Sequence, residues 1–492
     1  MATDNDDDNQ QPTDPASGLF GVRHRSLTIG LVSIVTLVAF ESLAVITILP
    51  DIEEELKGLA WYGWVTTAFF LGTMIGIVFA GGQADRRGAG RPYVIGLILF
   101  AVGLVVAGTA PSMPVLVVGR FVQGFGAGVV PAIGYVAIGR VYPVELRPRM
   151  FAVLSTAWVV PGVIGPALSE RVSAWIGWRW VFLGLLPLVG VAGSLIVPAM
   201  TRLRAPVPTT SRGGEVAEAP MPWTRRRMVE AVRVAAGAAL VVGSFTTNAW
   251  LVAPALVGGA VIGVPPLRRL TPPGTLVAAA GLPAVVLSRG LLTFAFFGTD
   301  TFVPHALTDG KGATTFAGSI AVTTSTLGWT SATWIQQRFI TRTGEAFFVR
   351  LSYVALAIGI AIVAVTAGVD DIPFWVVHVG WTIAGLGMGL GYSAHAQLTL
   401  RCAPAASYGT ATASLQLFDN LGVALGAGAT GVVVTLGDHL DWDPGAGVAV
   451  ALIGPAALAL LGLGVSRRLP ERAGTPRAGS KRRPHVAMTD AS

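Results

Sequence analysis

Long apolar stretches separated by short polar loops dominate the 492-residue chain. A helix needs about 20 mostly apolar residues to cross the roughly 30 Å of hydrocarbon in a bilayer. Fourteen stretches meet or approach that length, near residues 27–49, 61–81, 92–110, 113–138, 150–169, 179–200, 230–246, 249–266, 281–304, 314–337, 346–368, 373–398, 407–436 and 444–465. The pattern predicts an all-α integral membrane protein with fourteen transmembrane helices.

Three polar segments divide these stretches. Residues 1–26 are polar and acidic and predict a disordered cytoplasmic tail, while residues 466–492 predict a basic cytoplasmic tail. A linker rich in Pro and Gly, residues 201–229, separates the first six predicted helices from the rest. We therefore expect a six-helix bundle at 27–200, two additional transmembrane helices at 230–266, and a second six-helix bundle at 281–465.

The composition excludes an ordinary soluble domain and a disulfide-stapled secreted fold. Only 12% of the residues are charged, against about 25% in soluble domains, and the single cysteine, Cys402, excludes an intramolecular disulfide. If both termini are cytoplasmic, 28 of the 34 Lys and Arg residues lie in the tails and inward-facing loops. This bias follows the positive-inside rule. We therefore attribute the net charge of +7 to loops that orient the protein in the cytoplasmic (inner) cell membrane and contact lipid headgroups, and not to a surface that binds nucleic acid.

Four short segments place charged residues at the predicted helix ends or inside the helices, and three of them also contain glycines. AFESLAVITILP, residues 39–50, places Glu41 in an apolar segment. GGQADRRGAGR, residues 81–91, follows the second predicted helix, and LVVGRFVQGFGAG, residues 116–128, places Arg120 inside the fourth. WVVPGVIGPALSE, residues 158–170, lies in the fifth. An ionisable side chain inside a membrane is energetically unfavourable. We therefore expect each one to have a paired side chain, a water-filled cavity or a function.

The four segments together resemble signatures of the major facilitator superfamily, and their order matches its fourteen-span drug:proton antiporters (multidrug efflux type). Two departures are visible: the acid of the first signature is usually aspartate, and Leu168, Ser169 and Glu170 stand where the fifth-helix antiporter motif continues with small residues. The matching positions are Glu41 and Pro50; Gly82, Asp85, Arg86, Gly88 and Arg91; Arg120, Gln123, Gly124, Gly126 and Gly128; and Gly162, Gly165 and Pro166.

Self-comparison of the chain indicates an internal repeat. Residues 71–88 align without gaps on 327–344, with Thr341 in place of Asp85, and residues 124–128 align on 385–389. The second alignment carries Arg120 onto Trp381 and Arg140 onto Arg401. Two related halves are typical of alternating-access transporters of this class.

Helix geometry places Glu41 and Arg120 at one depth. Both lie about 12–14 Å below the outer surface at about 1.5 Å per residue, so we expect them to share a cavity, directly or through water. In the functional interpretation Glu41 exchanges a proton for substrate, since burial favours its protonated form while Arg120 favours the charged form. A static ion pair that fixes helix packing is the alternative.

Other candidate residues lie in the second half and in the two glycine motifs. Asp419, in mid-span, is a candidate second protonation site or cation contact. Asp300 lies near an outer helix end, where water can reach it, and is a candidate for a functional role. The alternative for each is a structural role as a hydrogen-bonded acid. Arg289 is expected to snorkel inward. Asp85 with Arg86 and Arg91 is expected to gate the cytoplasmic side, or else to cap a loop. Several aromatic residues are candidates to line an apolar substrate cavity: Trp158, Phe294, Phe297, Trp329, Trp381 and Tyr392.

The sequence contains no metal-spaced His or Cys cluster and no phosphate loop, so we expect no enzyme and no cofactor other than the proton gradient as energy source. The resemblance implies proton-coupled export of hydrophobic or cationic small molecules by alternating access, in a protein expected to be a monomer whose partners are substrate, protons and the lipid bilayer. Export of one endogenous lipid or secondary metabolite, and nutrient import by proton symport, are the alternatives.

Overall fold

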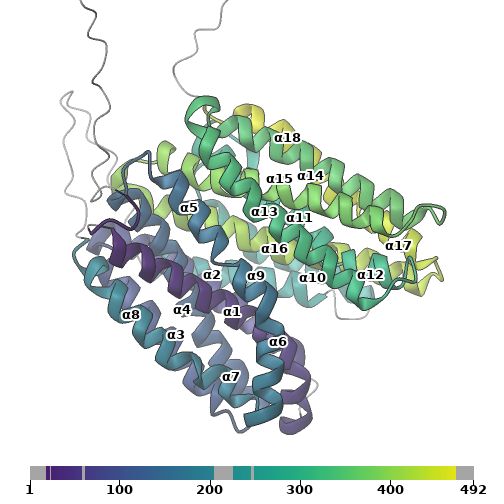
Figure 1. Cartoon of the computed structure of the whole chain (residues 1–492), viewed down its shortest axis with the longest axis horizontal. Coiled ribbons are helices and arrows are strands. Elements are labelled where there is room, and N and C mark those ends of the chain that lie inside the picture. Colours follow the sequence, from purple (N-terminus) through teal and green to yellow (C-terminus); the bar gives the residue numbers. More distant parts are fainter. Residues whose placement is uncertain (1–17, 23, 58–60, 204–224, 245–248, 472–492) are drawn as a thin grey trace, which may run out of the picture.

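A computed structural model describes residues 18–22, 24–57, 61–203, 225–244 and 249–471, and their regular elements are helices (Figure 1). Most of the predicted tails 1–26 and 466–492 and of the predicted linker 201–229 lies outside the described residues. The long and short α-helices are α1 (Arg25–Leu56), α2 (Tyr62–Arg87), α3 (Gly90–Gly108), α4 (Met113–Val141), α5 (Arg147–Thr156), α6 (Val159–Ile176), α7 (Arg179–Leu183), α8 (Leu185–Thr201), α9 (Arg225–Ser244), α10 (Ala249–Leu270), α11 (Leu282–Asp300), α12 (Val303–Thr308), α13 (Thr315–Thr343), α14 (Glu345–Gly368), α15 (Trp375–Cys402), α16 (Tyr408–His439), α17 (Pro444–Ala451) and α18 (Ile453–Val465). Short 3-10 helices are η2 (Thr275–Val277), η3 (Ala405–Ser407) and η4 (Ser466–Arg468).

Each of the fourteen predicted stretches lies on one helix or on a consecutive pair. Among the described residues, nine helical segments are long and apolar enough to cross a membrane, or ten if the bent pair formed by residues 147–162 and 167–176 is one span. Helix α13 falls outside this set, and it carries serines, threonines and glutamines along its length. The fold therefore has nine to ten candidate spans, and the count of fourteen stays a prediction.

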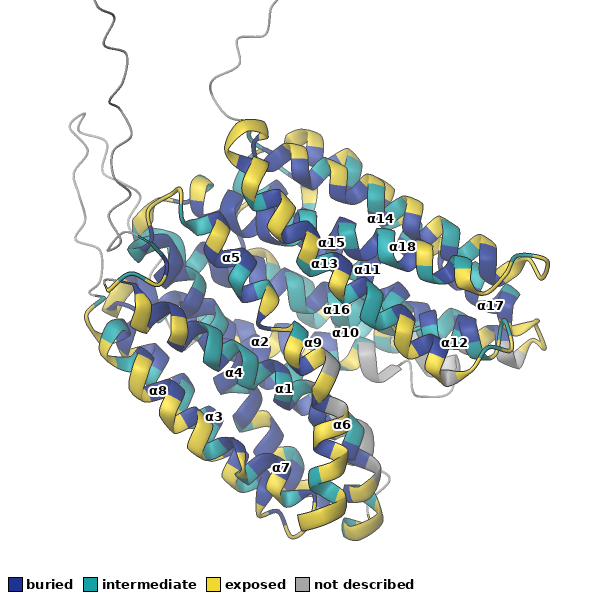
Figure 2. Cartoon of the chain, in the orientation of Figure 1, coloured by how far each residue is buried: buried dark blue, intermediate teal, exposed yellow. Residues whose placement is uncertain are grey.

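The outer faces of the molecule suit a hydrocarbon environment. Exposed residues follow the outward sides of α3, α8 and α14, whereas the sides that face neighbouring helices are buried (Figure 2). Several of these exposed side chains are large and apolar, including Ile98, Val191 and Ile358. In water such faces would be an aggregation hazard, but lipid tails solvate them without cost.

Glycines bring α2 and α4 into backbone contact. A methyl group on Gly124 would overlap the carbonyl oxygen of Phe69, and one on Gly128 would overlap that of Thr73. Small residues let helices approach this closely, which gains van der Waals packing where lipid provides no hydrophobic drive between helices. The glycine motif in α4 is therefore a packing surface.

The second half repeats this contact. A methyl group on Gly385 of α15 would overlap the carbonyl oxygen of Ser325, and one on Gly389 would overlap that of Trp329 in α13. These four positions are those that the sequence alignment assigns to the α2–α4 contact, because α2 maps onto α13 by a shift of 256 residues and α4 onto α15 by 261. The predicted internal repeat is confirmed in three dimensions.

The first group of helices, α1 to α8, and the second group, α11 to α18, meet at one end of the molecule. Helix α2 packs on α16, and α5 packs on α13. From the end where α2 and α16 meet, the groups spread apart toward the end that carries α7 and α17 (Figure 1). Helices α9 and α10 pack on each other, and α9 also contacts both α2 and α16.

The glycine contact generates a stability prediction. Gly124→Ala should lower the free energy of unfolding by about 1–3 kcal/mol, because the added methyl group has no space and must push α2 away. Gly190→Ala is the matched control, since nothing lies within 4 Å of the position where its methyl group would be. Thermal unfolding in detergent measures both. Equal midpoints for the two variants would contradict the packing role.

Candidate functional site

Glu41 of α1 and Arg120 of α4 form an ion pair inside the first group of helices. Their side chains are only 1% and 3% exposed. Arg120 also donates a 2.7 Å hydrogen bond to Oε1 of Gln123 and lies 4.3 Å from the ring centre of Phe69. The two residues that helix geometry placed at one depth are thus in direct contact.

The carboxylate of Glu41 is engaged on one side only. Its Oε1 accepts from the Arg120 guanidinium, whereas its buried Oε2 has no hydrogen-bond partner in the described part of the chain. A buried polar atom without a partner is costly and calls for an explanation. A proton on Oε2 would turn that oxygen into a donor while Oε1 keeps its bond to Arg120. The geometry can therefore accommodate both protonation states.

Asp85, near the end of α2, binds the N-terminus of α16. Its Oδ1 accepts from the backbone N–H of Gly409 at 2.7 Å, and its Oδ2 accepts from the N–H and hydroxyl of Thr410 at 2.7 and 2.8 Å. The first N–H groups of a helix lack internal partners and carry the positive end of its dipole, so a carboxylate stabilises them. This contact joins the two groups of helices.

The backbones of α2 and α16 almost touch at this contact. A methyl group on Gly409 would overlap the carbonyl oxygen of Gly81. Asp85 also forms an ion pair with Arg140 of α4, whose Nη2 lies 3.6 Å from Oδ1 and which also donates to the carbonyl of Ala84. Arg140 was missed as a site residue, although the repeat alignment had marked it as the counterpart of Arg401.

The other residues of this motif surround the contact. Gly82 and Gly88 are buried, and Gly88 has a φ of +82°, a conformation that favours glycine at the end of α2. Arg86 and Arg91 are exposed, as expected for residues at a membrane face. Their predicted part in gating remains a prediction, since the ion pair to Asp85 comes from Arg140.

The fifth predicted span bends. Its two segments, residues 147–162 and 167–176, meet at an angle of 45°. Gly162 ends the first segment, and Gly165 and Pro166 lie between the two segments. A methyl group on Gly162 would meet open space, while one on Gly165 would lie 3.5 Å from the ring of Phe40 on α1. Proline and glycine weaken a helix at such a position, which accounts for the bend. The part of this motif in export stays a prediction.

Asp419 of α16 pairs with Arg289 of α11. Nε of Arg289 lies 2.8 Å from Oδ1 of Asp419, and the hydroxyl of Tyr392 donates to Oδ2 at 3.0 Å. The prediction that Arg289 snorkels inward is wrong: the side chain is 2% exposed and is held by Asp419 and the carbonyl of Tyr392. Pairing in place offsets the cost of a buried charge, so the arginine need not reach the membrane surface.

Asp300, the last residue of α11, accepts a 3.1 Å hydrogen bond from the indole N–H of Trp381. Trp381 is the repeat counterpart of Arg120, and the two helix shifts place the counterpart of Glu41 between residues 297 and 302, a range that contains Asp300. The two halves thus hold an acid on their first helix against a donor on their fourth. The donor is charged in the first half and neutral in the second.

Aromatic rings fill the space between Asp300 and Asp419. Trp381 stacks on Phe296 at 4.8 Å, Phe296 contacts Trp329 at 5.6 Å, and Trp329 contacts Tyr392 at 5.0 Å. Of the six aromatic candidates, four therefore lie in one cluster: Phe297, Trp329, Trp381 and Tyr392. Trp158, at 46% exposed, lies outside this cluster, at the start of α6. Within the described ranges, no group of three or more metal-ligating side chains is present.

Comparisons with known proteins agree with this arrangement. The family model of the Major Facilitator Superfamily matches residues 29–427. A probable multidrug-efflux transporter of Mycobacterium tuberculosis is 27% identical over 435 residues, which cover 84% of this chain and 88% of that protein. Multidrug resistance protein 3 of Bacillus subtilis is 28% identical over 162 residues, 33% of this chain and 32% of its own length.

Solved structures show the same fold at low sequence identity. A human organic anion transporter superposes with a TM-score of 0.65 at 13% identity, covering 90% of this chain and 99% of its own. A proton:xylose symporter superposes with a TM-score of 0.61 at 14% identity, covering 92% and 95%. Since the family model matches most of the chain, the protein belongs to the major facilitator superfamily and is a multi-pass membrane transporter of the secondary type, not an enzyme.

Proposed function

We propose that the protein is a proton-coupled exporter of hydrophobic cationic small molecules in the cytoplasmic membrane. The observation that carries this proposal is the buried Glu41–Arg120 pair, in which one carboxylate oxygen is bound and the other is free to take a proton. The relatives named for multidrug efflux support export, and the resemblance to fourteen-span antiporters supports α9 and α10 as two added spans. Both termini are then cytoplasmic, and the protein acts as a monomer.

Charge balance couples proton and substrate at Glu41. When the carboxyl is neutral, Arg120 leaves a net positive charge among α1, α2 and α4, which disfavours a cation. When the proton leaves, the pair is neutral overall, and a cation can approach the free oxygen at a lower electrostatic cost. Proton and cationic substrate therefore exclude one another, which is the requirement for exchange.

Asp85 supplies the gate for alternating access. In this structure α2 and α16 are joined at the end that carries Asp85, and the helices spread apart at the opposite end. With both termini cytoplasmic, this arrangement is closed to the cytoplasm. Separation of Gly409 and Thr410 from Asp85 would open that side, after which the two groups of helices rock about the fixed site.

The second half supplies substrate contacts. The π-faces of partly exposed aromatic rings and nearby carboxylates both attract a cation. The cluster around Trp329 lies between two acids, Asp300 and Asp419. Asp300 has only a neutral donor, so no arginine neutralises it when it is ionised, and a proton or a cation can take that place. Asp419 is already balanced by Arg289, so its part is to hold Tyr392 in place for such contacts.

Two other functions remain open. Export of one endogenous lipid or secondary metabolite would use the same exchange and gate. Proton symport of a nutrient would require proton and substrate to bind together, which the balance of charge at Glu41 disfavours for a cation.

Transport by inside-out vesicles tests the proposal. Vesicles acidified inside and supplied with ethidium or tetraphenylphosphonium should show proton release and uptake of the cation. Glu41→Gln should abolish cation-driven proton release, because an amide cannot bind and release a proton. Asp309→Asn is a matched control, since that exposed acid lies in a loop. A pH-indicating dye measures the release, and parental vesicles that release no protons with either cation would contradict exchange.

Stability measurements separate a proton carrier from a static ion pair. Arg120→Gln should cost about 3–5 kcal/mol of unfolding free energy where Glu41 is charged, because it leaves a buried charge alone. A carboxyl that can take a proton escapes this cost, so the loss should be smaller at about pH 5.5 than at about pH 8. Denaturation in detergent measures both. The same loss at the two pH values would favour the static pair.

A further inference from the structure

The α9–α10 pair lies across the junction between the two groups of helices. One side of α9 packs on α2 and on α16 at the same time, and its first turn lies beside the Asp85 contact. The apolar part of this junction consists of Met74 and Ile75 of α2, Ala231, Val234, Ala235 and Ala238 of α9, Leu270 of α10, and Leu417 and Leu421 of α16. Movement of α16 away from α2 would expose this surface.

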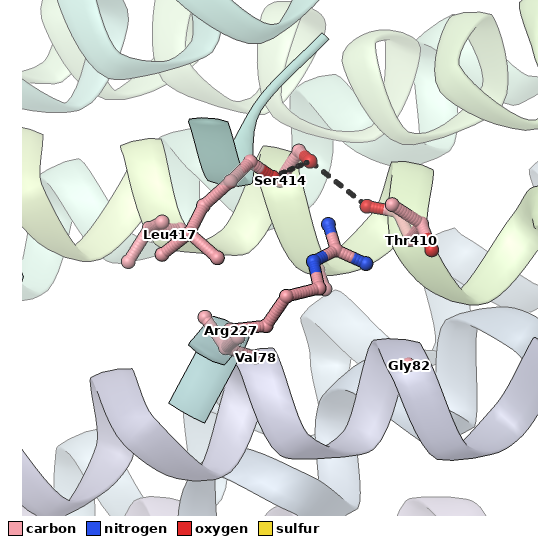
Figure 3. Close-up of a pocket in the computed structure, with 8 residues that line it drawn as sticks. Val78, Gly82, Arg227, Thr410, Ser414 and Leu417 are labelled. Carbon is pink, nitrogen blue, oxygen red and sulfur yellow. Dashed lines mark hydrogen bonds between the residues drawn. The ribbon is translucent and has the colours of Figure 1, made fainter. Parts of the chain in front are cut away.

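Arg227 of α9 points into a hollow between α2 and α16 (Figure 3). Val78 and Gly82 of α2 form one wall, and Thr410, Ala413, Ser414 and Leu417 of α16 form the other. The guanidinium lies between Thr410 and Ser414 in the view of Figure 3. Thr410 is the residue whose N–H and hydroxyl hold Asp85. Arg227 thus lies beside the gate and lines this hollow together with residues of both of its sides.

The neighbouring charges of α9 and α10 are already paired. Glu230 is 6% exposed and lies 3.4 Å from Arg226 and 3.3 Å from Arg269 of α10, which ties the two helices together. Arg227 is in electrostatic range of Glu230 and also, to a smaller extent, of Asp85. In a partly dehydrated hollow such an attraction is screened less than at an open surface.

We propose that the α9–α10 pair is a brace that stabilises closure between α2 and α16, and that Arg227 is the positioning residue through which it acts on Asp85. The inference rests on the proposed gate and adds a role for the two additional helices. Opening would hydrate Arg227 and expose Leu417 and Leu421, so the brace favours the closed arrangement only. Arg227 lines the hollow beside the gate and need not contact substrate.

Distance measurements across the gate test the brace. Spin labels at Arg149→Cys and Ala405→Cys, in a Cys402→Ser background, report the separation of the two groups by double electron–electron resonance in lipid nanodiscs. The parent should show mainly the short distance, and Arg227→Ala should raise the long-distance fraction several-fold. Arg227→Lys should retain most of the short-distance fraction. Arg233→Ala is the matched control, because Arg233 lies on the exposed side of α9.

Variants at Asp85 separate failure of the brace from failure of the gate. If Asp85→Asn raises the long-distance fraction and Arg227→Ala does not, the gate stands and the brace is wrong. If neither variant changes the distances, both proposals are wrong. If both variants open the gate and their combination opens it no further, Arg227 acts through Asp85. Arg227→Gln keeps a polar side chain of similar reach, and its unchanged elution in gel filtration would exclude misfolding as the cause.

Discussion

The cost of placing a charge in hydrocarbon constrains the interior of this transporter. An isolated ionised side chain there is unfavourable by at least about 2.5–3.5 kcal/mol, and the buried acids met above each have a donor within reach. Arg120 donates to Glu41, the N-terminus of α16 donates to Asp85, and Arg289 donates to Asp419. These partners come from different helices, so the same contacts that neutralise the acids also fix how the helices lie.

The acids differ in how much of their charge is balanced, and this difference separates their roles. Asp419 is held by an arginine and a tyrosine and is a structural centre. Asp85 pairs with Arg140 of its own group of helices, but its bonds to Gly409 and Thr410 exist only while α16 is docked, so its balance depends on whether the two groups of helices are together. Glu41 has an arginine on one oxygen and none of the described residues on the other. A proton or a cation can bind this second oxygen, so Glu41 is the residue to which we assign the exchange.

Much of the fold followed from local features of the sequence. The apolar stretches predicted the helices, and the self-alignment, which includes the glycine pattern, predicted two related halves. Depth along a helix was enough to bring Glu41 and Arg120 together. The number of membrane spans did not follow, because helices such as α13 carry polar side chains and apolarity alone does not decide whether they cross.

Partners on distant segments were the part that the sequence could not supply. Arg289 and Asp419 are 130 residues apart, and Asp85 meets a helix terminus 324 residues away. One sequence contains no record of such contacts, so Arg289 was expected at the membrane surface and Arg140 was not assigned to the gate. Similarly, nothing local to Arg227 indicates that α9 lies against α2 and α16.

Proton release from the purified protein tests the central claim, that one carboxyl binds either a proton or a cation. Tetraphenylphosphonium is added to the protein in weakly buffered detergent solution near pH 7, and a pH-indicating dye records the protons released per protein. The account predicts release by the parent that saturates with the cation, and no release by Glu41→Gln. Equal release by both proteins, or cation binding by the parent without any release, would contradict it.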